Sequence, residues 1–182
     1  MKKTTLFTIV LAISLFATLI ITYAVERESD IARQVLRLHV VANSNNDYDQ
    51  ALKYAIRDRI VEETRELFAD SNCVEVSKQL ATENLDLLLS IAQEEIKNHG
   101  FNYNVSISLG TQAFPATVYG NIMFPVGVYD ALIITIGNAV GENWWCVIFP
   151  PLCFIDGINM ESADNNEIQI RFRIFDALSG NS

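Results

Sequence analysis

Only two side chains in the sequence are suited to acid–base catalysis near neutral pH. The chain has 182 residues and two histidines, His39 and His99, and a histidine can act as a general base. His39 lies in an alternating apolar segment on the same side as Arg37, and His99 precedes a glycine where a helix is expected to end. Neither lies near a sequence that resembles a nucleophile elbow. The pattern favours a His39 side chain on the solvent or partner side of a strand, and we expect no catalytic residue.

Acidic residues occur in pairs whose spacing does not suit catalysis or metal binding. The pairs are Glu62-Glu63, Glu94-Glu95, and Asp47 with Asp49. Consecutive residues on a helix point about 100° apart, so the glutamates are expected on solvated faces. Asp47 and Asp49 begin an expected helix, where the dipole favours negative charge. The sequence has no complete calcium loop, no paired cysteines at zinc spacing and no glycine-rich phosphate loop. We expect no metal and no cofactor.

The cysteines are Cys73, Cys146 and Cys153. Cys146 and Cys153 flank a Pro-Pro turn, which can bring their α-carbons within the roughly 4.4 to 6.8 Å that a disulfide needs. They are therefore a disulfide candidate. Cysteine is also among the residues most often buried, so two buried thiols are the alternative.

The densest aromatic stretch is NWWCVIFPPLCF, residues 143–154, which carries no charge. Trp144 and Trp145 are adjacent, so on a strand they face opposite sides of the sheet. One can enter the core, while the other is covered by a helix, exposed or held against a partner. Exposed tryptophan is typical of binding hot spots. Core packing and a binding or membrane-facing surface both remain open for this stretch.

The N-terminal segment is apolar and is preceded by two lysines. Residues 4–25 are uncharged and rich in Leu, Ile, Phe and Ala, and Glu26 ends the run. This pattern is typical of a signal peptide or a single membrane anchor. Thr22-Tyr23-Ala24 has the small-large-small pattern of a cleavage site, but the run is also long enough to span a bilayer. We expect residues 1–25 to be a signal peptide or membrane anchor, and residues 30–182 to form one extracytoplasmic domain.

The charge of the chain excludes a nucleic-acid groove. The formal net charge is -9, and residues 98–170 contain no lysine or arginine. Phosphate binding depends on such side chains. We expect no nucleic-acid partner.

The periodicity predicts an α+β fold. One strand is followed by two amphipathic helices and then by several short strands separated by Gly, Pro and Asn turns. The expected strands are 35–42, 103–109, 116–119, 122–124, 128–136, 144–149 and 168–174, and the expected helices are 47–68 and 74–98. We predict an antiparallel sheet of about five to seven strands with the two helices packed on one face, preceded by the N-terminal signal or anchor helix.

Three blocks of sequence resemble a known family. They are LRLHVVANSNNDYDQALKYAIRD (36–58), FPATVYGNIMFPVGVYDALIITIG (114–137) and GENWWCVIFPPLCFID (141–156). In order and spacing they resemble the stage II sporulation protein R family of endospore-forming bacteria. The sequence departs from the family at Asn45, where an acidic residue is usual.

The resemblance implies a signalling role without catalysis. Members of this family are exported from the forespore into the space between the two sporulating membranes. There they activate a membrane-embedded, polytopic aspartic protease of the mother cell, which then processes a sigma-factor precursor. Motif position and polarity suggest as partner-binding residues Arg37, His39, Asn43, Trp144, Trp145 and Asp156. The alternatives are an extracytoplasmic hydrolase that uses His39 with Asp156, and a structural cell-envelope module.

Overall fold

The computed structural model describes residues 2–119 and 122–153, and these form an α+β fold. The elements follow one another as α1 (Lys2–Arg33), β1 (Leu36–Val41), α2 (Asp47–Leu67), α3 (Val74–Glu83), α4 (Leu85–Asn98), β2 (Val105–Phe114), β3 (Thr117–Tyr119), β4 (Ile122–Phe124), β5 (Gly127–Ile136) and β6 (Asn143–Phe149). The α+β class is confirmed. The expected strand 168–174 and Asp156 lie outside the described residues.

The strands form two sheets, and the larger one is mixed. Its order is β2-β5-β1-β6, while β3 and β4 pair as a separate hairpin. β1 runs parallel to β5 and antiparallel to β6, so the expectation of a purely antiparallel sheet is wrong. The reason lies in the connection: the three helices lead from β1 into β2, β2 runs antiparallel to β5 and returns the chain to the end where β1 begins, and β5 then starts from that same end. A parallel pair needs a long connection of this kind. β2 and β5 pair antiparallel over ten residues each.

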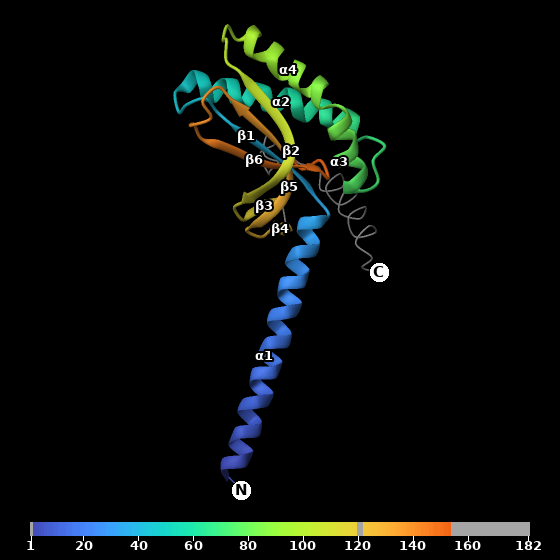
Figure 1. Cartoon of the computed structure of the whole chain (residues 1–182), viewed down its shortest axis with the longest axis vertical. Coiled ribbons are helices and arrows are strands. Elements are labelled where there is room, and N and C mark those ends of the chain that lie inside the picture. The colour runs from blue at the N-terminus through green and yellow to red at the C-terminus, as the bar shows by residue number, and fades with distance from the viewer. Residues whose placement is uncertain (1, 120–121, 154–182) are drawn as a thin grey trace, which may run out of the picture.

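The helices α2, α3 and α4 cover one face of the larger sheet (Figure 1). Their apolar stripes include Leu52, Ile56, Leu88 and Ala92, which are fully buried in the shared core. The expected second helix, 74–98, is divided at Asn84, whose side-chain Nδ2 donates to the Leu80 carbonyl oxygen at 2.8 Å. A side-chain amide competing for the last carbonyls of a helix explains the division.

The end of α4 follows the glycine stop that the sequence predicts. Gly100 adopts a φ of 76°, in the left-handed region, and its N–H donates to the Lys97 carbonyl oxygen at 2.9 Å. Glycine takes this conformation without the steric penalty of a β-carbon. The chain then turns back toward β2.

The β3–β4 hairpin lies beside one end of the larger sheet, near the point where α1 joins the domain (Figure 1). Tyr119 and Phe124 are its buried side chains, and their rings meet edge to face. The hairpin therefore adds a small second layer to the core on the side away from the helices.

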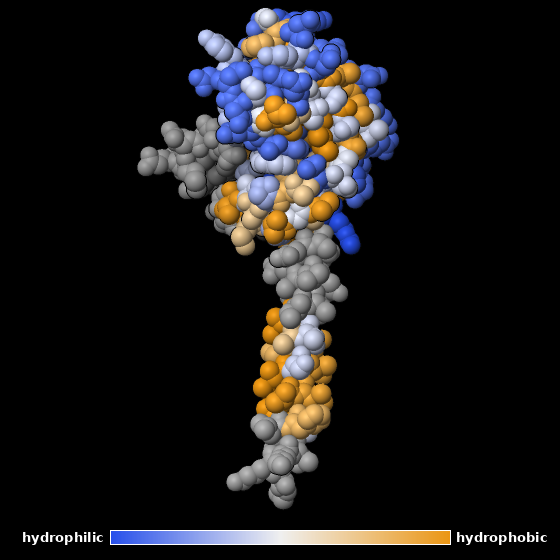
Figure 2. Space-filling model, turned by 60° about the vertical axis from the view of Figure 1, so that its left-hand side comes forward, coloured by the Kyte–Doolittle hydropathy of each residue, from blue (hydrophilic) through white to orange (hydrophobic). Residues whose placement is uncertain are grey.

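The α1 helix extends away from the domain and has apolar side chains on its surface (Figure 2). Large apolar residues between Phe7 and Ile20 are exposed, while Ile31 and Ala32 pack against the core. Within the described ranges, no helix combines the length and apolarity that a membrane span requires. The predicted export signal or anchor stays a prediction.

Candidate functional site

The aromatic stretch lies on β6, at one edge of the larger sheet as described. β6 pairs with β1, and Trp145 lies opposite His39 while Trp144 lies opposite Val40. Adjacent residues on a strand point to opposite faces, so the two tryptophans contact different layers. Both are half-buried. The edge strand therefore presents one large aromatic side chain on each face of the sheet.

Trp145 stacks on His39 on the face away from the helices. The two ring centroids are 3.8 Å apart with an angle of 8° between the planes, and Phe114 meets Trp145 edge to face at 4.7 Å. The Nε2 atom of His39 donates to the Oδ1 atom of Asn143 at 2.8 Å. Trp145 is thereby held in a fixed orientation by its neighbours.

The environment of His39 is not that of an exposed base. The side chain is only 6% exposed, so its expected position on the solvent side of the strand is wrong. Burial lowers the pKa of His39, and the hydrogen bond with Asn143 only partly opposes this. The stack with Trp145 encloses the ring, and burial of this kind favours the neutral imidazole.

Arg37 lies on the same face as His39 and is fully buried. Its guanidinium carbon is 4.1 Å from the centre of the Phe114 ring and 4.9 Å from that of Tyr129, and its Nη2 donates to the Thr117 Oγ1 at 3.1 Å. Burial lowers the pKa of Arg37, although Tyr119 and Tyr129 oppose that effect. Arg37 therefore does not face solvent, although it shares the face of the strand on which His39 was expected to be exposed. Its cation contacts aromatic faces, which attract positive charge.

Trp144 lies on the helix side and contacts α2. The guanidinium of Arg57 lies 4.2 Å from the centre of the Trp144 ring, and Tyr54 meets the same ring edge to face at 5.6 Å. Arg57 also pairs with Asp58 at 2.6 Å. Tyr54 is 40% exposed, so this group reaches the surface.

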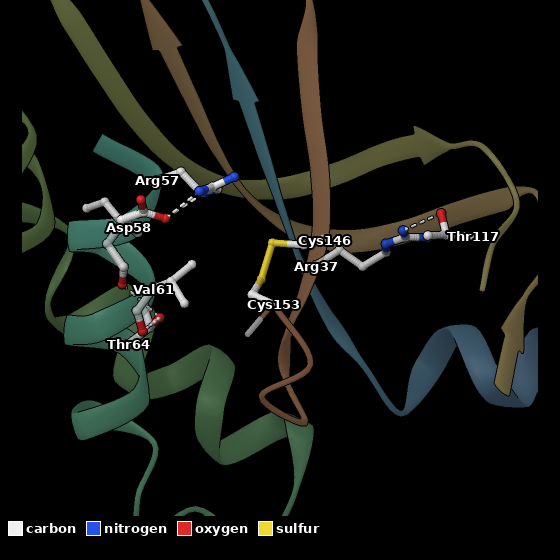
Figure 3. The surroundings of a disulfide bond; sticks show 9 residues. Arg37, Arg57, Asp58, Val61, Thr64, Thr117, Cys146 and Cys153 are labelled. Carbon is white, nitrogen blue, oxygen red and sulfur yellow. Dashed lines mark hydrogen bonds and ion pairs between the residues drawn. A yellow bond between two sulfur atoms is a disulfide. The ribbon is translucent and has the colours of Figure 1, made fainter. Parts of the chain in front are cut away.

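The end of the aromatic stretch is closed by a disulfide. Cys146 and Cys153 are joined, with their α-carbons 5.3 Å apart, so the bridged alternative is the one found here. Figure 3 shows the bond beside α2, near Val61, whereas Arg37 points away from it toward Thr117. The bond ties the turn after β6 back to the strand that carries both tryptophans.

Asn43 belongs to a separate polar cluster at the other end of β1. Asp49 is fully buried, and its Oδ2 accepts hydrogen bonds from Asn43 Nδ2, Ser44 Oγ and Asn46 Nδ2. Asn46 is the N-cap of α2, because its Oδ1 accepts from the Asp49 N–H at 2.7 Å. The cluster fixes the loop that precedes α2.

The charge of Asp49 is stabilised by these donors. Burial alone would raise the pKa of Asp49, but hydrogen bonds from Ser44, Asn43, Tyr103 and Asn46 outweigh it and hold the pKa below its usual value. Several donors to one carboxylate favour the ionised form. A cluster of three or more His, Cys, Asp or Glu able to hold a metal ion does not occur in the part of the chain that the structure describes.

The sequence matches one protein family over most of its length. The family model for Stage II sporulation protein R (spore_II_R) matches residues 32–159. The chain belongs to this family. It is also 39% identical over 137 residues to the Stage II sporulation protein R of Bacillus subtilis (strain 168). That alignment covers 75% of the chain and 61% of the relative, so the chain spans about three fifths of the length of the relative. No solved structure matches the chain. The name of this family refers to sporulation.

The structure groups the predicted residues of this family member into three places. Arg37, His39 and Trp145 lie on one face, Trp144 lies on the opposite face, and Asn43 lies at the end of β1. Their role as partner contacts stays a prediction. Sequence reasoning missed Phe114, Arg57 and Asn143, which hold the tryptophans. All three lie within the sequence blocks that resemble the family, and this was the one signal that marked them.

Proposed function

We propose that this protein is an exported sporulation signal that activates a membrane-embedded aspartic protease of the mother cell, so that the protease processes a sigma-factor precursor. The observation that carries the proposal is family membership over residues 32–159. The name of the family specifies sporulation, and the protease and its substrate are our extension of it.

The geometry supports action by binding. Trp144 and Trp145 are half-buried on an edge strand, and each is oriented by aromatic and polar neighbours. Oriented, partly exposed aromatic side chains bind partners at a low cost in conformational entropy. His39, the residue best suited to acid–base chemistry in a hydrolase, is buried against Trp145. We therefore assign the protein no catalysis of its own.

The proposed mechanism is a shift in the population of protease states. A ligand shifts a conformational equilibrium only by binding one state better than the other. The proposed contact surface is the β6 edge of the larger sheet, with Trp145 on one face and Trp144 and the exposed part of Tyr54 on the other. His39 and Arg37 support it from behind: His39 stacks on Trp145, and Arg37 packs against Phe114.

The test is reconstitution of processing with the full chain, the protease and the sigma-factor precursor. We expect Trp144→Ala, Trp145→Ala or both to abolish processing while the variant protein still accumulates. Leu87→Ala is the matched control, because Leu87 is a large apolar residue on α4 that is 42% exposed. It should process normally. Full processing by both tryptophan variants would contradict the proposed surface, and failure of the full chain to crosslink to the protease would contradict the partner.

The proposed location is the space between the forespore and mother-cell membranes. It is supported by the two lysines before the uncharged residues 4–25, because positive charge before an apolar run favours export of the domain on its C-terminal side. A reporter fused after residue 30 should be found outside the forespore cytoplasm. A cytoplasmic reporter would refute both the route and the partner.

A further inference from the structure

The longest uncharged part of the domain ends in exposed apolar residues. Residues 98–129 contain no Asp, Glu, Lys or Arg, in a chain with a formal net charge of -9. Within this segment Val118, Met123, Val126 and Val128 are 61 to 73% exposed. These four residues are here called the hairpin surface. Large apolar side chains gathered in this way on an exposed face indicate a contact with another apolar body.

The hairpin itself is apolar on both faces. Val118 and Met123 are directly opposite each other in the β3–β4 pairing and point outward, whereas Tyr119 and Phe124 point into the core. The outward face of such a hairpin is normally polar, because strands alternate between a buried and a solvated side. Burial in the domain explains why residues 119 and 124 are apolar. It does not explain why the outward-facing Val118 and Met123 are apolar.

The strand register places the hairpin surface at the same end of the domain as α1. β5 is parallel to β1, with Ala131 opposite Arg37, so the first residues of β5 extend past the start of β1. Phe114 pairs with Gly127, so the chain between them projects from this same end. The α1 helix ends at Arg33, just before β1 begins. Apolar surface gathers at this end of the domain in Figure 2.

We infer that the hairpin surface docks on a lipid bilayer. The surface lies at the end of the domain from which α1 extends, and farther along α1 the residues from Phe7 to Ile20 also expose apolar side chains, so one bilayer can receive both. Shallow insertion of exposed apolar side chains about 5–10 Å into the boundary between headgroups and acyl chains is a known mode of peripheral binding. The hairpin surface therefore fixes the orientation of the domain on the membrane.

Charge distinguishes a bilayer from a protein partner. A protein interface usually surrounds its apolar centre with a polar and charged rim. Residues 98–129 contain no charged side chain, and the charges nearest to them at this end of the domain belong to the last turns of α1 (Glu26, Arg27, Glu28, Asp30 and Arg33) and to Asp130. The remainder of the domain is acidic, and an anionic membrane surface repels it. The uncharged segment is thus the part of the domain that approaches lipid at the lowest electrostatic cost. The inference does not depend on the proposed protease.

The experiment measures the contact of single positions with lipid in the full chain reconstituted into phosphatidylcholine–phosphatidylglycerol vesicles. An environment-sensitive fluorophore is attached at Met123→Cys in a Cys73→Ser background. The matched control is Tyr48→Cys, because Tyr48 is 78% exposed and follows the opposite end of β1. We expect lipid-borne nitroxides to quench the label at residue 123 and aqueous iodide to quench the label at residue 48.

A second measurement avoids the label. Backbone amide exchange of residues 122–128 in the unmodified chain should slow when vesicles replace lipid-free buffer, while exchange in residues 47–50 should not change. Val118→Asp should restore both fast exchange and iodide quenching at residue 123, because a carboxylate resists transfer into lipid. Three results would overturn the inference: water-accessible labels at both positions, shielding of residue 123 that requires the protease, or shielding without lipid that grows with protein concentration.

Discussion

Trp145 and His39 form a parallel stack on the edge of the larger sheet, with ring centroids 3.8 Å apart and planes 8° apart. His39 Nε2 donates to Asn143, and its Nδ1 is buried without a hydrogen-bond partner in the described part of the chain. A neutral imidazole tolerates this arrangement, since Nδ1 is then an acceptor. A protonated ring would bury an unpaired N–H. The stack therefore makes the fold sensitive to acid.

The first prediction concerns stability below neutral pH. Burial lowers the pKa of His39 in the folded state below its ordinary value of 6.5, so the unfolded chain binds the proton more tightly. The free energy of unfolding should thus be highest above pH 6.5 and should fall as the pH drops from 6.5 toward the folded-state pKa. Urea denaturation at a series of pH values from about 7.5 to about 5 measures the slope.

Two variants identify the source of that slope. His39→Phe keeps an aromatic ring on Trp145 and removes the titrating group, so its unfolding free energy should be nearly independent of pH in this window. His99→Gln alters the exposed histidine at the end of α4 and should retain the parental slope. An unchanged slope in His39→Phe would contradict the assignment.

The second prediction concerns the buried cation at Arg37. Its side chain contacts Phe114 and Tyr129 and is fully buried, and no carboxylate pairs with it in the described ranges. Burying an ion is costly even when aromatic faces compensate in part. Arg37→Met fills a similar volume without charge and should be as stable as the parent or more so. Arg37→Ala leaves a cavity and should lose about 2–5 kcal/mol.

The measurement is the free energy of unfolding of both variants by urea denaturation. Equal large losses in Arg37→Met and Arg37→Ala would show that the cation has an anionic partner, which would contradict the prediction.

The third prediction concerns the disulfide. Cys146 and Cys153 are seven residues apart, so their bond closes a short loop. Cross-linking a loop of this size stabilises the fold by about 2–3 kcal/mol, because it restricts the unfolded chain. A reductant should lower the unfolding free energy of the parent by that amount. Cys73→Ser should stay sensitive to the reductant and Cys153→Ser should not, since Cys73 is a free thiol.

The sequence predicted the bounds of the strands better than it predicted which strands pair with each other. Alternation and helical spacing located five of the described strands within two residues at each end, because periodicity is a local property. β2 is the exception: it continues to Phe114, well past the expected end at residue 109. The pairing of β1 with β5 was missed, because the two strands are separated in the chain by three helices, β2 and the β3–β4 hairpin. A local sequence pattern cannot show that β5 lies between β2 and β1 in the sheet.

The candidate site shows the same limit. Position in the motifs identified Trp145 and His39, but alternation wrongly placed His39 toward solvent. A strand in the middle of a sheet can be buried on both faces, and each residue of β1 is buried. The hairpin and Trp145 cover the second face of β1. Such cover comes from residues distant in sequence, so it is invisible to a local pattern.

The last prediction concerns the loop contact at the end of β1. The Gly141 N–H donates to the Ala42 carbonyl oxygen at 2.9 Å, and a β-carbon added at Gly141 would clash with the Ser44 carbonyl oxygen. A backbone atom cannot move aside as a flexible side chain does, so Gly141→Ala must displace the loop that carries Asn43 and Ser44. It should lose more than about 2 kcal/mol of unfolding free energy.

Gly110→Ala is the matched control for Gly141→Ala. A β-carbon at Gly110 would meet only the Ile133 Cδ1 at 3.7 Å, an ordinary contact on β2. Its unfolding free energy should stay within about 1 kcal/mol of the parent, since alanine also loses less entropy on folding than glycine. Because the displaced loop donates to Asp49 through Asn43 and Ser44, Gly141→Ala should also make the protein unfold at a higher pH on acidification. Equal stability of the two variants would mean that the loop is not held as closely against Gly141 as these distances require.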